Sequence, residues 1–137
     1  MKALVVESSS TMRSVLHRLL LVRGFEVSEA DDSSNALDVL QQMGSADLVL
    51  LNLGLHEAES LEWIARLRHE VTRNTEIVIL AEREPEAREL HRALIAGADD
   101  YLVKPFTAKQ IDEKLAKAGF NDHWVSPPDS QDQTCRY

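Results

Sequence analysis

Apolar residues in this chain gather into two kinds of segment that alternate along the sequence. Five short runs rich in valine, isoleucine and leucine favour β-strands, and three of them are continuous instead of alternating with polar residues. A continuous apolar run is typical of a strand that is covered on both faces. The predicted strands span residues 3–6, 25–30, 47–51, 76–80 and 100–103.

Between these runs, apolar residues recur with the period of a helix that packs one face on a core. The first helix is expected to have Ser9 or Ser10 as its N-cap, and the second to run from about 34 to 43 and stop at Gly44. Pro85 is expected in the first turn of the fourth helix and Thr107 as the N-cap of the fifth. The predicted inner faces of the first, third, fourth and fifth helices are Met12, Val15, Leu16, Leu19 and Leu20; Leu61, Ile64, Leu67 and Val71; Ala87, Leu90 and Leu94; and Ala108, Ile111, Leu115 and Ala118.

Strict alternation of strands and helices predicts an α/β fold, with a doubly wound parallel sheet of five strands and helices on both faces. In such sheets the working site lies outside the carboxyl ends of the strands. The residues at these ends are Glu7 and Ser8, Asn52, Ala81 and Glu82, and Lys104 and Pro105.

The length of 137 residues suits one domain of ordinary size. We expect this domain to span residues 1–119, where the alternating pattern ends at Gly119. The remaining segment, 120–137, is polar apart from Trp124 and carries Pro127 and Pro128, which predicts a flexible C-terminal tail or linker.

The formal net charge of −8 argues against a direct nucleic-acid partner, because such surfaces need clustered Lys and Arg. Cys135 is the only cysteine, so neither an intrachain disulfide nor a thiolate metal cluster is expected. The opening apolar run is too short for a secretory signal, and no run approaches the roughly 18 residues of a membrane span. A cytoplasmic protein without membrane contact is therefore expected.

Three stretches of the sequence resemble the receiver domain of two-component response regulators, over residues 1 to about 119. They are "LVVESSSTMR" from residue 4, "DLVLLNL" from residue 47 and "AGADDYLVKPF" at 96–106. The resemblance implies a flavodoxin-like (βα)5 receiver fold with strand order 2-1-3-4-5, acting in signal transduction. It also implies a phosphorylation switch, in which an Asp after the third strand accepts a phosphoryl group beside Mg²⁺ and an acidic pair.

The sequence departs from the family pattern at most of the positions that carry this chemistry. Asn52 stands at the phosphoacceptor position, and an amide lacks the nucleophilic oxygen needed to form an acyl phosphate. The acidic pair is Glu7 and Ser8, and the usual Thr or Ser after the fourth strand is Ala81. Only Lys104, with Pro105 behind it, matches. The chain is therefore interpreted as a degenerate receiver, or pseudo-receiver.

One carboxylate, Glu7, then faces one ammonium, Lys104, so the site is neutral without a metal. We expect either an ion pair between them or a hydrogen bond from Lys104 to the Asn52 carbonyl. Mg²⁺ requires carboxylates, so its binding is expected to be weak or absent. No cofactor, metal or catalytic residue is predicted, and the protein is not expected to be an enzyme.

The sequence leaves two other functions of the domain open. In one alternative, the receiver is still phosphorylated, but at another residue such as Ser8 or Glu7. In the other, the crevice with Lys104 and Asn52 is a metal-independent sensor of a small ligand. An engineered phosphoacceptor substitution is disfavoured, because Ser8 and Ala81 depart from the pattern as well.

Because no phosphoryl chemistry is expected at the strand ends, we expect the protein to act through its surface. By resemblance, the fourth helix, fifth strand and fifth helix form a face that meets a histidine kinase, an output protein or a second copy of the chain, and a solvated helix face is the alternative. Since Ala81 leaves room beside it, Tyr101, a switch position in the family, is expected to rest inward. The chain suits a stand-alone adaptor or a piece of a longer regulator. The candidate interaction face comprises Arg88, His91, Arg92, Ile95, Tyr101, Lys109 and Asp112.

Overall fold

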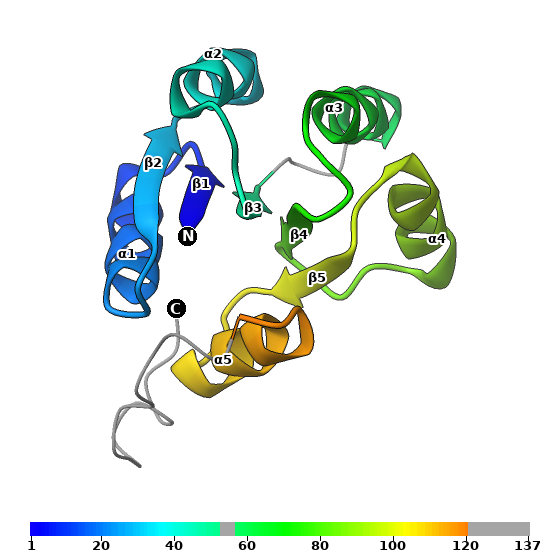
Figure 1. Ribbon diagram of the computed structural model, residues 1–137. Coiled ribbons are helices and arrows are strands. Elements are labelled where there is room, and N and C mark those ends of the chain that lie inside the picture. The colour runs from blue at the N-terminus through cyan, green and yellow to red at the C-terminus, as the bar shows by residue number, and fades with distance from the viewer. Residues whose placement is uncertain (53–56, 121–137) are drawn as a thin grey trace.

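The computed structural model describes residues 1–52 and 57–120, in which five strands and five helices alternate. The strands form one parallel sheet in the order β2-β1-β3-β4-β5 (Figure 1), which confirms the predicted fold class and strand order. The strands are β1 (Lys2–Val6), β2 (Glu26–Ala30), β3 (Leu48–Leu51), β4 (Glu76–Ala81) and β5 (Asp100–Val103). The helices are α1 (Ser10–Leu21), α2 (Ser33–Met43), α3 (Glu57–Glu70), α4 (Ala87–Ala96) and α5 (Ala108–Lys117).

Helices cover both faces of the sheet, with α1 and α5 on one side and α2, α3 and α4 on the other (Figure 1). Successive buried residues of β1, β3 and β4 therefore enter different halves of the core. In β1, Val5 packs with Leu16 and Leu20 of α1, whereas Leu4 packs with the cluster that contains Ile64 of α3. This two-sided burial explains why the sequences of β1, β3 and β4 contain continuous apolar runs.

Helices α1 and α5 begin at the capping residues that the sequence predicted. Ser9 is the N-cap of α1, since its hydroxyl accepts a hydrogen bond from the Met12 N–H at 3.2 Å. Thr107 caps α5 in a reciprocal capping box with Gln110. These caps satisfy backbone N–H groups that have no partner inside the helix.

Helix α4 differs from the sequence prediction at its start and on its inner face. Glu86 is the N-cap, so Pro85 lies before the helix and not in its first turn. The residue buried in α4 is Ala93, whereas Ala87 is exposed and 43% of the Leu94 surface is accessible. The predicted inner face was wrong at Ala87 and Leu94, because small Ala93, not the larger Leu94, is the residue of this helix buried against the core.

The core extends one residue beyond the predicted domain boundary at 119. Phe120 is 8% exposed, and its ring meets that of Phe25 edge to face at a centroid distance of 5.4 Å. The predicted tail or linker otherwise lies outside the described residues. Within the described part of the chain, no helix has the length and apolar character needed to cross a bilayer.

Candidate functional site

Parallel strands bring the sequence-predicted site residues to one edge of the sheet. Glu7 directly follows β1 and Asn52 follows β3, which is the neighbouring strand. The backbone fixes both positions, because Glu7 N–H bonds the Ala30 carbonyl and Asn52 N–H bonds the Val6 carbonyl, at 3.0 and 2.9 Å. Strands that are distant in sequence therefore deliver their last side chains to one crevice.

The carboxylate of Glu7 is the centre of this crevice, and only 1% of the residue is exposed. One of its oxygens, Oε1, accepts hydrogen bonds from Asn52 Nδ2 and from Lys104 Nζ, both at 2.7 Å. The other, Oε2, accepts the Ser9 N–H at 3.0 Å. Three donors therefore hold one buried carboxylate, and the predicted ion pair between Glu7 and Lys104 is present.

These contacts change the acidity of Glu7. Burial is the largest single influence and raises its pKa, because it disfavours the charged form. The hydrogen bonds from Lys104, the Ser9 N–H and Asn52, together with the Lys104 charge, act in the opposite direction. Their combined effect is larger, so the pKa of Glu7 lies below its ordinary value and the carboxylate is ionised at neutral pH.

Two further charged residues extend the network: Glu82, which the sequence pattern placed at this strand end, and Arg13, which it did not. Glu82 Oε1 lies 3.3 Å from Lys104 Nζ, so the ammonium bridges a buried and an exposed carboxylate. Arg13 donates from Nη1 to the Glu7 carbonyl at 2.8 Å and from Nε to Glu29 at 3.0 Å. The Arg of "STMR", one helical turn beyond Ser9, was the available sequence signal for this second contact.

The remaining departures from the family pattern lie beside this network. Ser8 is exposed at the end of β1, and Ala81 is buried as the last residue of β4. Ala81 lines an apolar hollow of about 10 Å³ that Tyr101 also lines. That volume holds roughly one water-sized group.

Tyr101 covers this hollow with its ring while its hydroxyl remains at the surface. The residue is half-buried, and its hydroxyl donates to Glu84 Oε1 at 2.6 Å. Lys114 Nζ lies 5.0 Å from the ring centroid and 2.9 Å from Asp100 Oδ1. The bond to Glu84 is the largest of the influences that raise the pKa of the Tyr101 phenol. Tyr101 thus has partners on both sides, Glu84 and Lys114, that the sequence reasoning missed.

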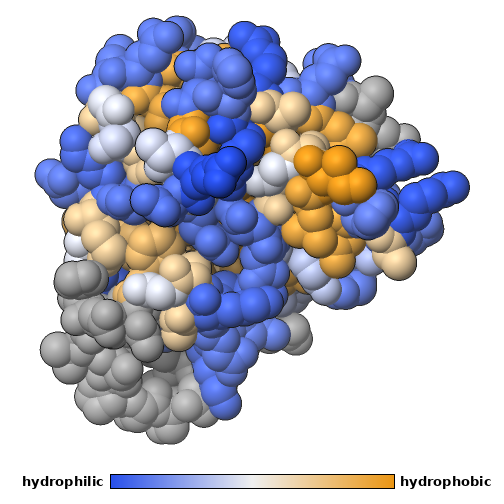
Figure 2. All heavy atoms as spheres, turned by 45° about the vertical axis from the view of Figure 1, so that its right-hand side comes forward, coloured by the Kyte–Doolittle hydropathy of each residue, from blue (hydrophilic) through white to orange (hydrophobic). Residues whose placement is uncertain are grey.

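The proposed interaction face is intact along α4 and interrupted on α5. Arg88, His91, Arg92 and Ile95 are all exposed, as predicted, and Lys109 is exposed on α5. Figure 2 shows apolar atoms gathered among polar ones on the side of the molecule turned forward, and the large apolar residues exposed on α4 are Leu94 and Ile95.

Asp112 does not belong to the surface to which it was assigned. Its carboxylate binds the guanidinium of Arg23, beyond the end of α1, with Oδ2 3.1 Å from Nη2. Arg23 is 3% exposed and also donates to the Leu19 carbonyl at 2.7 Å. The half-buried Asp112 is therefore a structural partner of a buried Arg, and its place in the interaction face is corrected.

The donor set at the strand ends differs from a Mg²⁺ site. Mg²⁺ takes hard oxygen ligands in octahedral geometry, whereas both oxygens of Glu7 are occupied by N–H groups and Asn52 presents a donor to it. Across residues 1–52 and 57–120, no group of three or more His, Cys, Asp or Glu side chains is arranged to hold a metal ion.

The fold and the strand-end site define a doubly wound α/β domain with its crevice at the carboxyl ends of the strands, and comparison with known proteins gives its family. The family model described as "Response regulator receiver domain" matches residues 3–116, so the chain belongs to the response regulator receiver domain family of two-component signalling. Receiver domains of this family interact with histidine kinases and output domains.

Individual relatives agree with this assignment. The chain is 31% identical over 131 residues to the transcriptional regulatory protein CpxR of Escherichia coli, an alignment that covers 96% of this chain and 54% of CpxR. The chain thus spans about half the length of this curated relative. Among solved structures, a response regulator from Thermotoga maritima has a TM-score of 0.75 at 27% identity, covering 85% of this chain and 95% of that one. Chemotaxis protein CheY4 of Vibrio cholerae, with a TM-score of 0.74 at 24% identity over 85% and 97%, shares the fold.

Proposed function

We propose that this receiver domain transmits signals through protein contacts without forming an aspartyl phosphate. The observation that carries the proposal is the convergence of Asn52 Nδ2 and Lys104 Nζ on the same oxygen of Glu7, each at 2.7 Å. The residue at the acceptor position is an amide, which is a poor nucleophile. The ammonium that would stabilise a transferring phosphoryl group neutralises Glu7 instead.

The energetics of this ion pair favour the same conclusion. If Lys104 moved to an incoming phosphoryl group, it would leave a carboxylate that is 1% exposed without its counter-charge. Breaking a buried pair costs on the order of 3–5 kcal/mol when one charge is left uncompensated. With both Glu7 oxygens bonded and Ser8 in place of a carboxylate, we propose that Mg²⁺ is not a resident cofactor and that the domain is not an enzyme.

The partner side of the proposal rests on the exposed surface of α4 and its neighbours. CpxR is a transcriptional regulatory protein, and we propose that this receiver likewise acts on an output protein or a histidine kinase by contact. The residues that would make this contact are the half-buried Tyr101 and the exposed Arg88, His91, Arg92, Leu94, Ile95 and Lys109.

A phosphoryl mimic tests the proposal at the site itself. Beryllium fluoride with Mg²⁺ takes the shape of a phosphoryl group on an acceptor carboxylate, and amide NMR spectra report whether it binds. The wild-type spectrum should not change when the mimic is added. A variant carrying Ser8→Asp, Asn52→Asp and Ala81→Thr rebuilds the family pattern and serves as the positive control. Saturable shifts at the strand ends of the wild type would overturn the proposal.

A further inference from the structure

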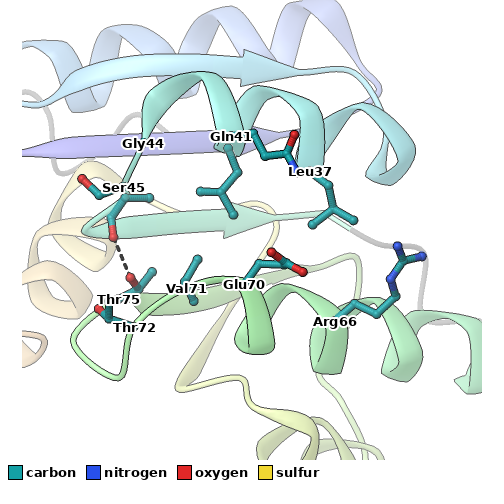
Figure 3. Close-up of a pocket in the computed structure, with 11 residues that line it drawn as sticks. Leu37, Gln41, Gly44, Ser45, Arg66, Glu70, Val71, Thr72 and Thr75 are labelled. Atoms are coloured by element: carbon teal, nitrogen blue, oxygen red, sulfur yellow. Dashed lines mark hydrogen bonds between the residues drawn. The ribbon is translucent and has the colours of Figure 1, made fainter.

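A second crevice lies between α2 and α3, at the edge of the sheet opposite to the Glu7 site (Figure 3). Gly44, Ser45 and Ala46 of its lining precede β3, and Thr72 and Thr75 precede β4, so it lies where these strands begin. Its volume of about 300 Å³ is at the lower end of the range for small-molecule sites. This groove is thus separate from the crevice that holds Glu7.

The floor of the groove is apolar. Leu37 and Leu40 reach it from α2, and Val71 follows the last residue of α3. Leu40 and Ala46 are buried, whereas Leu37 and Val71 are half-buried and keep accessible surface. A ligand with apolar side chains would therefore remove this surface from water, at about 25 cal/mol per Å².

The wall that leads into β4 is fixed by hydrogen bonds. The Thr75 hydroxyl, in a buried residue, donates to the Ala46 carbonyl at 2.6 Å, which links the starts of β3 and β4 (Figure 3). Arg68 Nη1 donates to the carbonyls of Thr72 and Thr75, both at 3.0 Å. Since these bonds are made within the domain, the groove is formed before a ligand enters, which lowers the ordering cost of binding.

Two opposite charges stand on the α3 side of the groove. Arg66 and Glu70 are both exposed and extend from α3 into the space beside α2 (Figure 3). Within the described ranges neither is in an ion pair, and the Arg66 guanidinium lies 4.9 Å from the centroid of the Trp63 ring. The two residues are one helical turn apart, which is about 6 Å along the helix axis. They therefore present a cation and an anion from successive turns of α3 beside an apolar floor.

From this arrangement we infer that the α2–α3 groove binds a small zwitterionic ligand of dipeptide size with apolar side chains. The two termini of an extended dipeptide lie about 7 Å apart, which is close to the rise of about 6 Å between these two residues along the α3 axis. The ligand carboxylate pairs with the planar guanidinium of Arg66, and its ammonium pairs with Glu70. Its side chains cover Leu37, Leu40 and Val71.

Titration of the labelled domain with L-leucyl-L-leucine, followed by amide NMR, tests this inference. The expected result is saturable shifts at residues of the groove, while the amides around Glu7 stay unchanged. Two blocked probes examine each charge: N-acetyl-L-leucyl-L-leucine lacks the ammonium and L-leucyl-L-leucinamide lacks the carboxylate. Each is expected to bind about threefold more weakly than the free dipeptide, which corresponds to the loss of one ion pair with an exposed side chain.

Variants of the protein test the same two ion pairs from the protein side. Glu70→Gln should weaken binding of the free dipeptide about threefold and leave binding of the acetylated probe unaffected. Arg66→Gln should likewise weaken binding of the free dipeptide about threefold and leave binding of the amide probe unaffected. Glu62→Gln, an exposed α3 position outside the groove lining, is the matched control and should bind like the wild type. All three positions are exposed, so folding is retained and is checked by thermal unfolding. Absence of saturable shifts, or equal binding of free and blocked probes, would overturn the inference.

Discussion

Lys104→Met is the perturbation that most clearly isolates the ion pair at the strand ends. Methionine retains most of the side-chain length and removes the charge that pairs with Glu7 at 2.7 Å. The Glu7 side chain is 1% exposed and that of Lys104 is 13% exposed, so water cannot readily replace the lost ammonium. The substitution therefore leaves a buried carboxylate with two of its three donors.

The expected cost follows from this burial. Removing one partner of a buried pair costs on the order of 3–5 kcal/mol. Here the Asn52 amide and the Ser9 N–H still donate to Glu7, which lowers the expected loss to about 2 kcal/mol of unfolding free energy at pH 7.

The effect must depend on pH in a defined direction. In the wild type the pKa of Glu7 is lowered from 4.5, so its stabilising contribution is present above that pH and is lost as the pH falls through the folded-state pKa. Without Lys104 the pKa of Glu7 rises, because the hydrogen bond and the charge of Lys104 no longer lower it. As the pH falls, Glu7 is therefore protonated in the variant before it is protonated in the wild type, which removes the uncompensated buried charge. The difference in unfolding free energy between the two proteins then shrinks to about half or less near pH 4.

Urea unfolding of both proteins at pH 7 and near pH 4 measures this difference. Lys117→Met is the matched control, because Lys117 is 74% exposed and lies 3.7 Å from Asp100. Its effect should stay within about 0.5 kcal/mol at both pH values. A loss in Lys104→Met of less than about 0.5 kcal/mol at pH 7, or an equal loss at both pH values, would refute the reasoning.

Three further substitutions, one of which serves as a comparison, test other parts of the structure. Gly97→Ala should destabilise the domain by about 2 kcal/mol or more, because φ is +131° and a Cβ there would lie 2.7 Å from Arg68 Cβ. Gly119→Ala, at φ +94° in open space, should cost only about 1 kcal/mol in urea unfolding, and equal losses would contradict this account. Glu84→Gln should lower the pKa of the Tyr101 phenol toward 10.0, since it removes the charged acceptor of its hydroxyl. NMR titration of the Tyr101 ring measures this pKa, and an unchanged value would disprove the role of Glu84.

Local signals in the sequence were sufficient to predict the strands, the helices and the α/β class, whereas the strand order was implied by the resemblance to receiver domains. Apolar runs and three-to-four-residue periods depend on neighbouring positions, and capping residues such as Ser9 and Thr107 define helix starts without tertiary information. The strand-end rule then brought Glu7, Asn52 and Lys104 together from three distant stretches, and the structure places them in direct contact.

The errors concern choices that depend on packing between elements. Large apolar residues predicted an inner face of α4 that includes Leu94, yet the buried residue of that helix is Ala93. Nothing near Asp112 in the sequence indicates that it pairs with Arg23, which is 89 positions away. The contact between Tyr101 and Glu84 likewise depends on how the loop before α4 lies against β5.

The intact mass of the protein after incubation with acetyl phosphate and Mg²⁺ is the most direct test of the central claim. The account predicts that the wild type gains no phosphoryl group, whereas the variant with Ser8→Asp, Asn52→Asp and Ala81→Thr gains one. A phosphoryl adduct on the wild type would contradict the account and show that another residue, such as Ser8 or Glu7, accepts the group.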